Sequence, residues 1–228
     1  TDAVQAFGKI KLDLQDLGVD YASFSGHKFY ALKGSGILYA KKSAPLSALI
    51  FGGGQERARR GGTENSLGIL SMGFMAEKLA KTSDFQDKNE AVKKLRDYFE
   101  KRVISEIDHV KINHASMDRV GGTSSLVLKD VEGEALLMAL DVKGFAVSTG
   151  SACSSGASQP SASLQAFGLS FNEARSTLRV SFGWFNTLEE VDSFINELKG
   201  IATRLRKLVG SREPNWGAGA SELSGIES

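Results

Sequence analysis

A lysine follows a histidine in segment 25–28 (SGHK), directly after an apolar run that begins at Tyr21. A lysine at the end of a strand can act as an amine nucleophile when burial favours its neutral form. The Gly-rich continuation at 32–36 (LKGSG) lets a bulky ligand approach the backbone. The ordinary alternative is an exposed lysine that only ends a strand. Lys28 is therefore a candidate for amine chemistry.

The only cysteine, Cys153, lies in a run of small polar residues at 148–158 (STGSACSSGAS), where a loop is expected. Free cysteines are usually buried among apolar side chains, whereas this one has only alanines nearby. Such a setting suits an accessible nucleophile on a mobile loop. The alternative is an incidental loop cysteine. A single thiol excludes an internal disulfide, and we predict no metal site because the three histidines lack metal-binding spacing.

Two further groups could bind anions. Segment 52–63 combines glycines and arginines with the hydroxyl of Thr63, just ahead of a predicted helix. That combination suits a phosphate clamp, although it also suits a solvated basic loop. Arg179 lies in an alternating stretch, and its planar guanidinium matches a carboxylate unless it is merely structural.

Helices and strands alternate along the chain, which favours an α/β fold. The residue patterns predict strands at 21–24, 37–40, 110–112, 124–128, 146–148 and 177–182, and a loop at 52–62. They predict helices at 64–81 and 134–140, one helix whose face carries Val92, Leu95, Phe99, Val103 and Ile107, and one that Thr187 and Glu190 open and that ends near 208.

The composition argues against several classes of partner and of protein. A net charge of +1 gives no electrostatic reason to expect nucleic acid or an anionic membrane as partner. Hydrophobic residues make up 41% of the 228 residues, which excludes disorder throughout. No apolar run approaches the roughly 18 residues of a membrane span. The single cysteine favours a reducing, cytoplasmic location.

In their order and spacing, these segments resemble the second half of group I cysteine desulfurases of the NifS/IscS type. Those enzymes use pyridoxal phosphate and belong to the aminotransferase-like (class V, fold type I) family. The matching stretches are DAVQAFGKI, SFSGHKFYALKGSGILY, GGGQERARRGGTEN, VEGEALLMALD, STGSACSSG and STLRVSFGWFNTLEEVD. The sequence departs from the family at 31–34 (ALKG for GPKG), at Ala58 (for glycine) and at 121–122 (GG for PN).

The resemblance implies a domain organisation. Residues 1–86 would be the remainder of the pyridoxal-phosphate-binding large domain, and 87–210 a smaller C-terminal α+β domain that carries the cysteine loop. Residues 211–228 would be a flexible tail, because they are rich in glycine and serine. Family members carry a further large block before the position of Asp2. We therefore expect this chain to be part of a longer protein.

The resemblance also implies cofactor-binding roles. Lys28 would form the Schiff base and then shuttle the substrate Cα proton. Asp2 would pair with the pyridinium nitrogen, and Gln5 would hydrogen-bond the phenolic oxygen. Ser25 and His27 would hold the phosphate.

Three more residues receive roles from the resemblance. Thr63 would reach the phosphate of the neighbouring subunit's cofactor, which implies a homodimer. Arg179 would bind the carboxylate of the substrate L-cysteine. Cys153 would attack the substrate sulfur and carry it as a persulfide to an iron–sulfur scaffold or another acceptor protein.

The implied activity converts L-cysteine to L-alanine, supplying sulfur for iron–sulfur clusters or thio-cofactors. Three alternatives stay open. One is a selenocysteine lyase, and another is a different fold-type-I pyridoxal-phosphate enzyme; a transaminase fits less well because it needs no mobile thiol. The third is a non-catalytic fragment that serves in dimerisation or scaffold binding.

Overall fold

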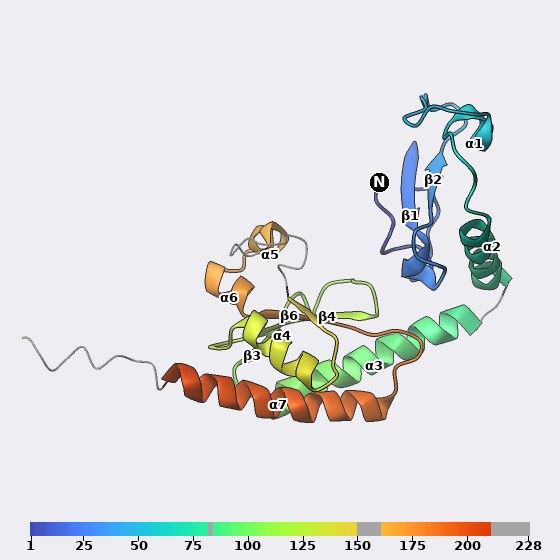
Figure 1. The fold of residues 1–228 in the computed structure, drawn as a ribbon. Helices are drawn as coiled ribbons and strands as arrows, with labels where there is room; N and C mark the ends of the chain where they lie inside the picture. The colour runs from blue at the N-terminus through green and yellow to red at the C-terminus, as the bar shows by residue number, and fades with distance from the viewer. Residues whose placement is uncertain (82–83, 150–160, 211–228) are drawn as a thin grey trace, which may run out of the picture. The chain divides into compact units, whose positions relative to one another are not determined.

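The computed structural model describes residues 1–81, 84–149 and 161–210 (Figure 1). They form two compact units, one of Thr1–Lys93 with Asp118–Gly121, the other of Lys94–Met117 with the described residues from Gly122 onward. Both units combine helices and strands, which confirms the expected fold class. The two units divide between Lys93 and Lys94, inside helix α3 (Asp84–Glu106). The domain boundary expected after residue 86 stays a prediction.

The first unit is built around two antiparallel strands, β1 (Tyr21–Ser25) and β2 (Gly36–Ala40). A four-residue 3-10 helix, η1 (Gly26–Phe29), follows β1, where the sequence predicted only the end of a strand. The ring of Phe7 contacts those of Phe24 and Phe29, with centroids 5.1 and 4.9 Å apart. These aromatic contacts thus pack the N-terminal turn that contains Phe7 against β1 and η1.

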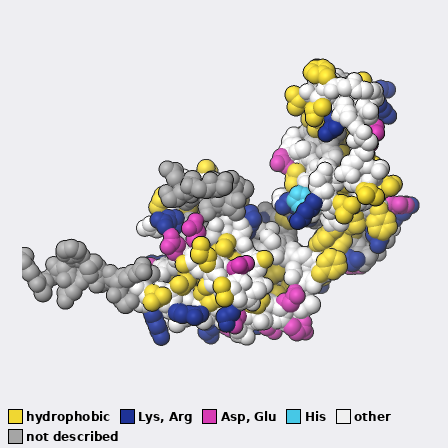
Figure 2. All heavy atoms as spheres, in the orientation of Figure 1, with side chains coloured by type: hydrophobic (Ala, Val, Ile, Leu, Met, Phe, Trp, Pro, Cys, Tyr) yellow, Lys and Arg dark blue, Asp and Glu magenta, His cyan; other side chains and the backbone are white. Residues whose placement is uncertain are grey.

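Helix α2 (Ser66–Lys81) confirms the predicted helix, and its Met72 packs beneath Phe29 and Ala31. Its other side is also apolar: Leu67, Leu70 and Phe74 are 71%, 68% and 58% exposed. Hydrophobic side chains gather over this helix in Figure 2. A cluster of large apolar side chains exposed on one side of a helix is suited to a partner surface.

The predicted loop at 52–62 contains one short turn, α1 (Gln55–Ala58). Glu56, Arg57 and Ala58 there have φ values of 47°, 57° and 60°, so the turn is left-handed rather than an ordinary helix. Glycine adopts this conformation without steric cost, whereas alanine is strained in it. The replacement of the family's glycine by Ala58 therefore falls at a position where the backbone favours glycine.

The second unit contains an antiparallel sheet with the strand order β3-β4-β6-β5. Its strands are β3 (Val110–Ile112), β4 (Thr123–Leu128), β6 (Thr177–Ser181) and β5 (Ser148–Thr149). The strand predicted at 146–148 overlaps β5 at Ser148, since Ser148 and Thr149 are the residues of the described segment up to 149 that pair with β6.

One face of this sheet carries the main core. Helices α3, α4 (Gly133–Val142) and α7 (Leu188–Gly210) contribute to one cluster with Leu126, Leu128, Leu178 and Val180. The predicted apolar face of α3 is confirmed, since Leu95, Phe99, Val103 and Ile107 lie in this cluster and Val92 is also buried. The predicted capping box is present as well, because the Glu190 amide donates to Thr187 Oγ1 at 3.3 Å and the Thr187 amide donates to Glu190 Oε2 at 3.2 Å.

The opposite face is covered in part by two short helices that the sequence analysis did not predict, α5 (Ala162–Ala166) and α6 (Phe171–Arg175). Val127 packs there with Leu164, Leu169 and Ala174. A capping box at Ser170 and Glu173 opens α6, and this spacing was the signal that could have revealed it. None of the described helices combines the length and the apolar character that crossing a bilayer requires.

The core predicts a large effect of one substitution in α3. Phe99 is fully buried and contacts Phe182 and Phe194 at centroid distances of 5.3 and 5.7 Å. Phe99→Ala should lower the free energy of unfolding by about 3–5 kcal/mol, because it leaves a cavity. Ile104→Ala, at an exposed position of the same helix, should cost less than about 1 kcal/mol in urea unfolding. Equal losses would contradict the assigned core.

Candidate active site

Asp2 lies beside β1 in the first unit. The Ala3 amide donates to the Ser23 carbonyl at 3.0 Å, and the Ser23 amide donates to the Thr1 carbonyl at 3.1 Å. Asp2 itself is exposed, and its Oδ1 accepts a hydrogen bond from the Val4 amide at 2.8 Å. These two backbone hydrogen bonds therefore hold Asp2 beside Ser23, two residues before the carboxyl end of β1.

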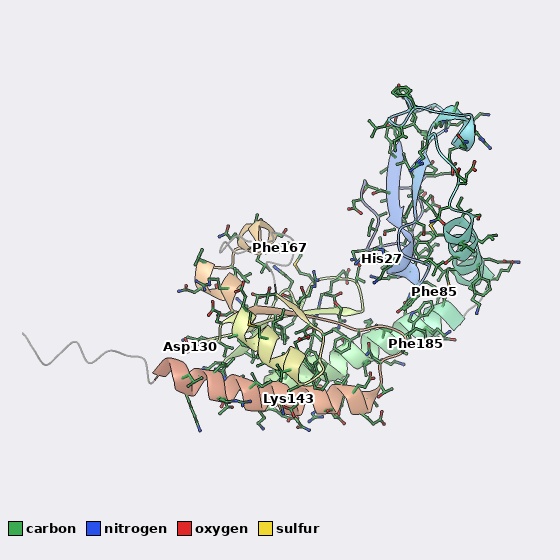
Figure 3. All side chains as sticks on the ribbon, viewed as in Figure 1. His27, Phe85, Asp130, Lys143, Phe167 and Phe185 are labelled. Carbon is green, nitrogen blue, oxygen red and sulfur yellow. The ribbon has the colours of Figure 1, made fainter. Side chains whose placement is uncertain are left out.

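The segment SGHK forms the turn at that end of β1. Ser25 Oγ and His27 Nδ1 lie 2.9 Å apart, within hydrogen-bonding distance. His27 is exposed, at the end of the strand (Figure 3), while Lys28 is half-buried. A hydroxyl, an imidazole and a primary amine are thus gathered within four residues.

Helix α2 and the loop after Lys28 hold this turn closely. A Cβ on Gly26 would lie 2.9 Å from Ser35 Oγ and 3.1 Å from Met72 Cγ, so the backbone packs where only glycine fits. The Leu32 amide donates to Ser71 Oγ at 2.9 Å, and Ser35 Oγ donates to the Leu32 carbonyl at 2.9 Å. The loop that departs from the family pattern is therefore anchored to α2.

Lys9 is a further candidate site residue, which the sequence analysis did not identify. Its ammonium donates to Gln5 Oε1 at 2.6 Å, which leaves the Gln5 amide nitrogen as the free donor end. Burial lowers the pKa of the Lys9 amine, and the positive charge of Lys28 lowers it further. The four-residue spacing of Gln5 and Lys9 on a helical turn was the available signal. Asp2, Gln5, Ser25, His27 and Lys28 all belong to this one unit.

Thr63 lies exposed in the loop before α2. No hydrogen bond joins it to Ser25, His27 or Lys28 in the part of the chain that the structure describes. In the basic segment before it, Arg60 Nη1 donates to the Gly61 carbonyl at 2.7 Å and so serves the turn itself.

Arg179 belongs to the second unit, where β6 holds it between Ser125 of β4 and Ser148 of β5. Its neighbours Leu178 and Val180 enter the main core, so Arg179 points to the opposite face and is exposed. Cys153 lies outside the described residues, in the segment that follows β5. Across the described ranges, no group of three or more His, Cys, Asp or Glu side chains is arranged to hold a metal ion.

Known proteins resemble this chain over most of its length. A sequence profile of the family Aminotransferase class-V matches residues 1–194. A cysteine desulfurase from Gluconacetobacter diazotrophicus is 38% identical over 226 residues, which are 99% of this chain and 55% of that protein. The chain thus spans about half the length of the curated relatives that it matches.

Solved structures resemble it too. A NifS-like protein superposes with a TM-score of 0.79 at 33% identity, over 89% of this chain and 52% of the other. A structure described as SspA in complex with cysteine gives a TM-score of 0.63 at 31% identity, over 82% of this chain and 50% of the other.

The proximity of two lysines predicts a measurable coupling. Lys28→Met removes a positive charge near Lys9, so the pKa of Lys9 should rise toward its ordinary value while the effect of burial remains. The pH dependence of Lys9 acylation, followed by peptide mass spectrometry, measures this pKa. Lys11→Met serves as the control because Lys11 is exposed. An unchanged pKa of Lys9 in the Lys28→Met protein would show that the two amines do not interact.

Proposed function

Because the chain belongs to the aminotransferase class-V family, we propose that it forms the second half of a pyridoxal-phosphate-dependent cysteine desulfurase. One observation carries the proposal. A half-buried lysine, Lys28, follows a hydrogen-bonded Ser25–His27 pair on the same unit that holds Asp2 and Gln5. The relatives described as cysteine desulfurase and the structure described as a complex with cysteine support this substrate.

The donor set of the first unit fits this cofactor. Lys28 would hold it covalently through its amine, and Ser25 and His27 would hold its phosphate beside the tightly packed Gly26. The Asp2 carboxylate would hold the ring nitrogen. Gln5 would donate to the ring oxygen, since its own carbonyl oxygen is occupied by Lys9. When bound, pyridoxal phosphate supplies an electron sink for negative charge at the substrate Cα.

The chain's own groups then divide the work on L-cysteine. With the cofactor bound, the Asp2 carboxylate would favour the protonated ring nitrogen, and the Lys28 amine would take the substrate Cα proton as general base. Arg179 binds the substrate carboxylate. The Cys153 thiolate forms a bond to the substrate sulfur while the substrate C–S bond breaks. The electron pair left on the substrate Cβ takes up a proton, and Lys28 returns a proton to Cα, which completes L-alanine. Cys153 keeps the sulfur as a persulfide.

The proposal extends to partners. Thr63 would bind the phosphate of the partner subunit's cofactor in a homodimer, so each site would be composite. The persulfide would pass to an iron–sulfur scaffold or another acceptor protein in the cytoplasm.

A second candidate function is a non-catalytic interaction module. The exposed apolar face of α2 favours it, because such a face is suited to a partner surface. Binding of a scaffold protein by the intact protein without any turnover of L-cysteine would support this alternative.

The catalytic proposal predicts different effects for two lysines. Lys28→Ala should lower L-alanine release from L-cysteine by about a hundredfold or more, because the general base is lost. Lys33→Ala is the control, since Lys33 is exposed and five residues further along. Borohydride reduction followed by peptide mass spectrometry should find the cofactor on Lys28 in the control and nowhere in Lys28→Ala. Normal turnover by Lys28→Ala would refute the assignment.

A substrate panel separates the related activities. The intact protein should release L-alanine from L-cysteine and should not transfer an amino group to a keto acid. Faster turnover of selenocysteine than of cysteine would favour a selenocysteine lyase, and amino transfer to a keto acid would favour a transaminase.

A further inference from the structure

Four polar residues form a row across the sheet of the second unit. The backbone amide of Asn113 donates to the backbone carbonyl of Ser125 at 2.9 Å. Ser125 lies opposite Arg179, and Arg179 lies opposite Ser148. Directly opposed residues of antiparallel strands point to the same face. We call Asn113, Ser125, Arg179 and Ser148 the polar row, and its face is the one turned away from the main core.

Part of this face is covered and part is not. Val127 and its partner Thr177 are buried, and α5 and α6 lie over that end of the sheet (Figure 1). The next pair on the same face is Ser125 and Arg179, of which Ser125 is half-buried and Arg179 exposed. The polar row therefore begins where the cover of α5 and α6 ends.

The side chain of Asn113 lies against Ser125, and its Oδ1 is buried with no hydrogen-bond partner among the described residues. Asn113 is only 5% exposed, and its Nδ2 donates to Ser125 Oγ at 3.0 Å. A hydroxyl that accepts this bond keeps its own proton to donate. Arg179 cannot take that proton, because a guanidinium has donors only. Within the described ranges, no other group accepts from Ser125 Oγ.

Ser148 lies on the other side of Arg179, and its hydroxyl already has an acceptor. Its Oγ donates to the Thr149 carbonyl at 3.3 Å, so its proton is already used. Arg179 has no acidic partner among the described residues. Among the described residues, the polar row thus places a hydroxyl donor beside a guanidinium, and neither has an acceptor there. A carboxylate supplies such acceptors on two adjacent oxygens.

We propose that Ser125 is a further substrate-binding residue, whose hydroxyl donates to the same α-carboxylate that Arg179 binds, and that Asn113 is the positioning residue for this hydroxyl. The inference rests on the proposed function and deepens it. Two donors on one carboxylate favour an α-amino acid over an amine that lacks the carboxylate. The neighbour Ser124 takes no part, since it is fully buried on the opposite face.

The test uses L-alanine, which carries the carboxylate but not the reacting sulfur. Isothermal titration of the intact, cofactor-loaded protein gives its Kd. Ser125→Ala should weaken L-alanine binding about tenfold, the usual effect of losing one hydrogen bond to a charged group. Ser124→Ala is the matched control and should leave the Kd unchanged, and Ser125→Thr should retain most of the affinity. With L-cysteine, Ser125→Ala should raise KM by a similar factor and leave kcat nearly unchanged.

A double-mutant cycle tests the role of Asn113. Asn113→Ala should weaken L-alanine binding in the wild-type background and have no further effect in the Ser125→Ala background. A merely structural role would instead make the two effects add.

Equal L-alanine binding by Ser125→Ala and Ser124→Ala overturns the inference alone. Wild-type protein that neither binds L-alanine nor releases it from L-cysteine overturns the inference together with the proposed function.

Discussion

The burial of Leu178 and Val180 fixes the arrangement of the second unit. Both side chains lie in the main core with α3, α4 and α7. Because side chains alternate along a strand, their burial turns Arg179 to the other face. The same alternation in β4 buries Leu126 and turns Ser125 outward beside Arg179. A one-residue slip of this register would bury the guanidinium, so hydrophobic burial itself fixes the face on which Arg179 lies.

The first unit depends on a comparable packing constraint. Phe7 contacts both Phe24 and Phe29. It thereby connects the turn that carries Gln5 and Lys9 to the strand before Lys28 and to the 3-10 helix that contains Lys28. Gly26 allows η1 to approach α2 at a distance where a Cβ would clash. Polar groups separated by some 20 residues in the sequence are therefore held in one unit by apolar contacts.

The sequence was sufficient where periodicity or a cap marks an element. The apolar face of α3 and the capping box of α7 were predicted for that reason, and β1 was predicted from a short apolar run. The short elements η1 and α5 were missed, because four or five residues show no period. The strand predicted at 146–148 overlaps β5 only at Ser148, since the described pairing with β6 begins at that residue rather than at Ala146.

In the candidate site, too, some residues could be predicted from the sequence and others could not. The order and spacing of the motifs were sufficient to propose Lys28, Arg179 and Cys153 as site residues. Lys9 and Ser125 were not marked, because their importance lies in what they touch: Lys9 contacts Gln5, and Ser125 accepts from Asn113. Such contacts follow from strand register and local turns, which residue types alone do not specify.

The central claim is that the chain moves sulfur from L-cysteine to Cys153. Its most direct test is peptide mass spectrometry of the intact, cofactor-loaded protein after brief incubation with L-cysteine, with thiols blocked under non-reducing conditions. We expect the peptide that contains Cys153 to gain the mass of one sulfur atom, in step with the L-alanine released. Release of L-alanine without added sulfur on that peptide would contradict the account.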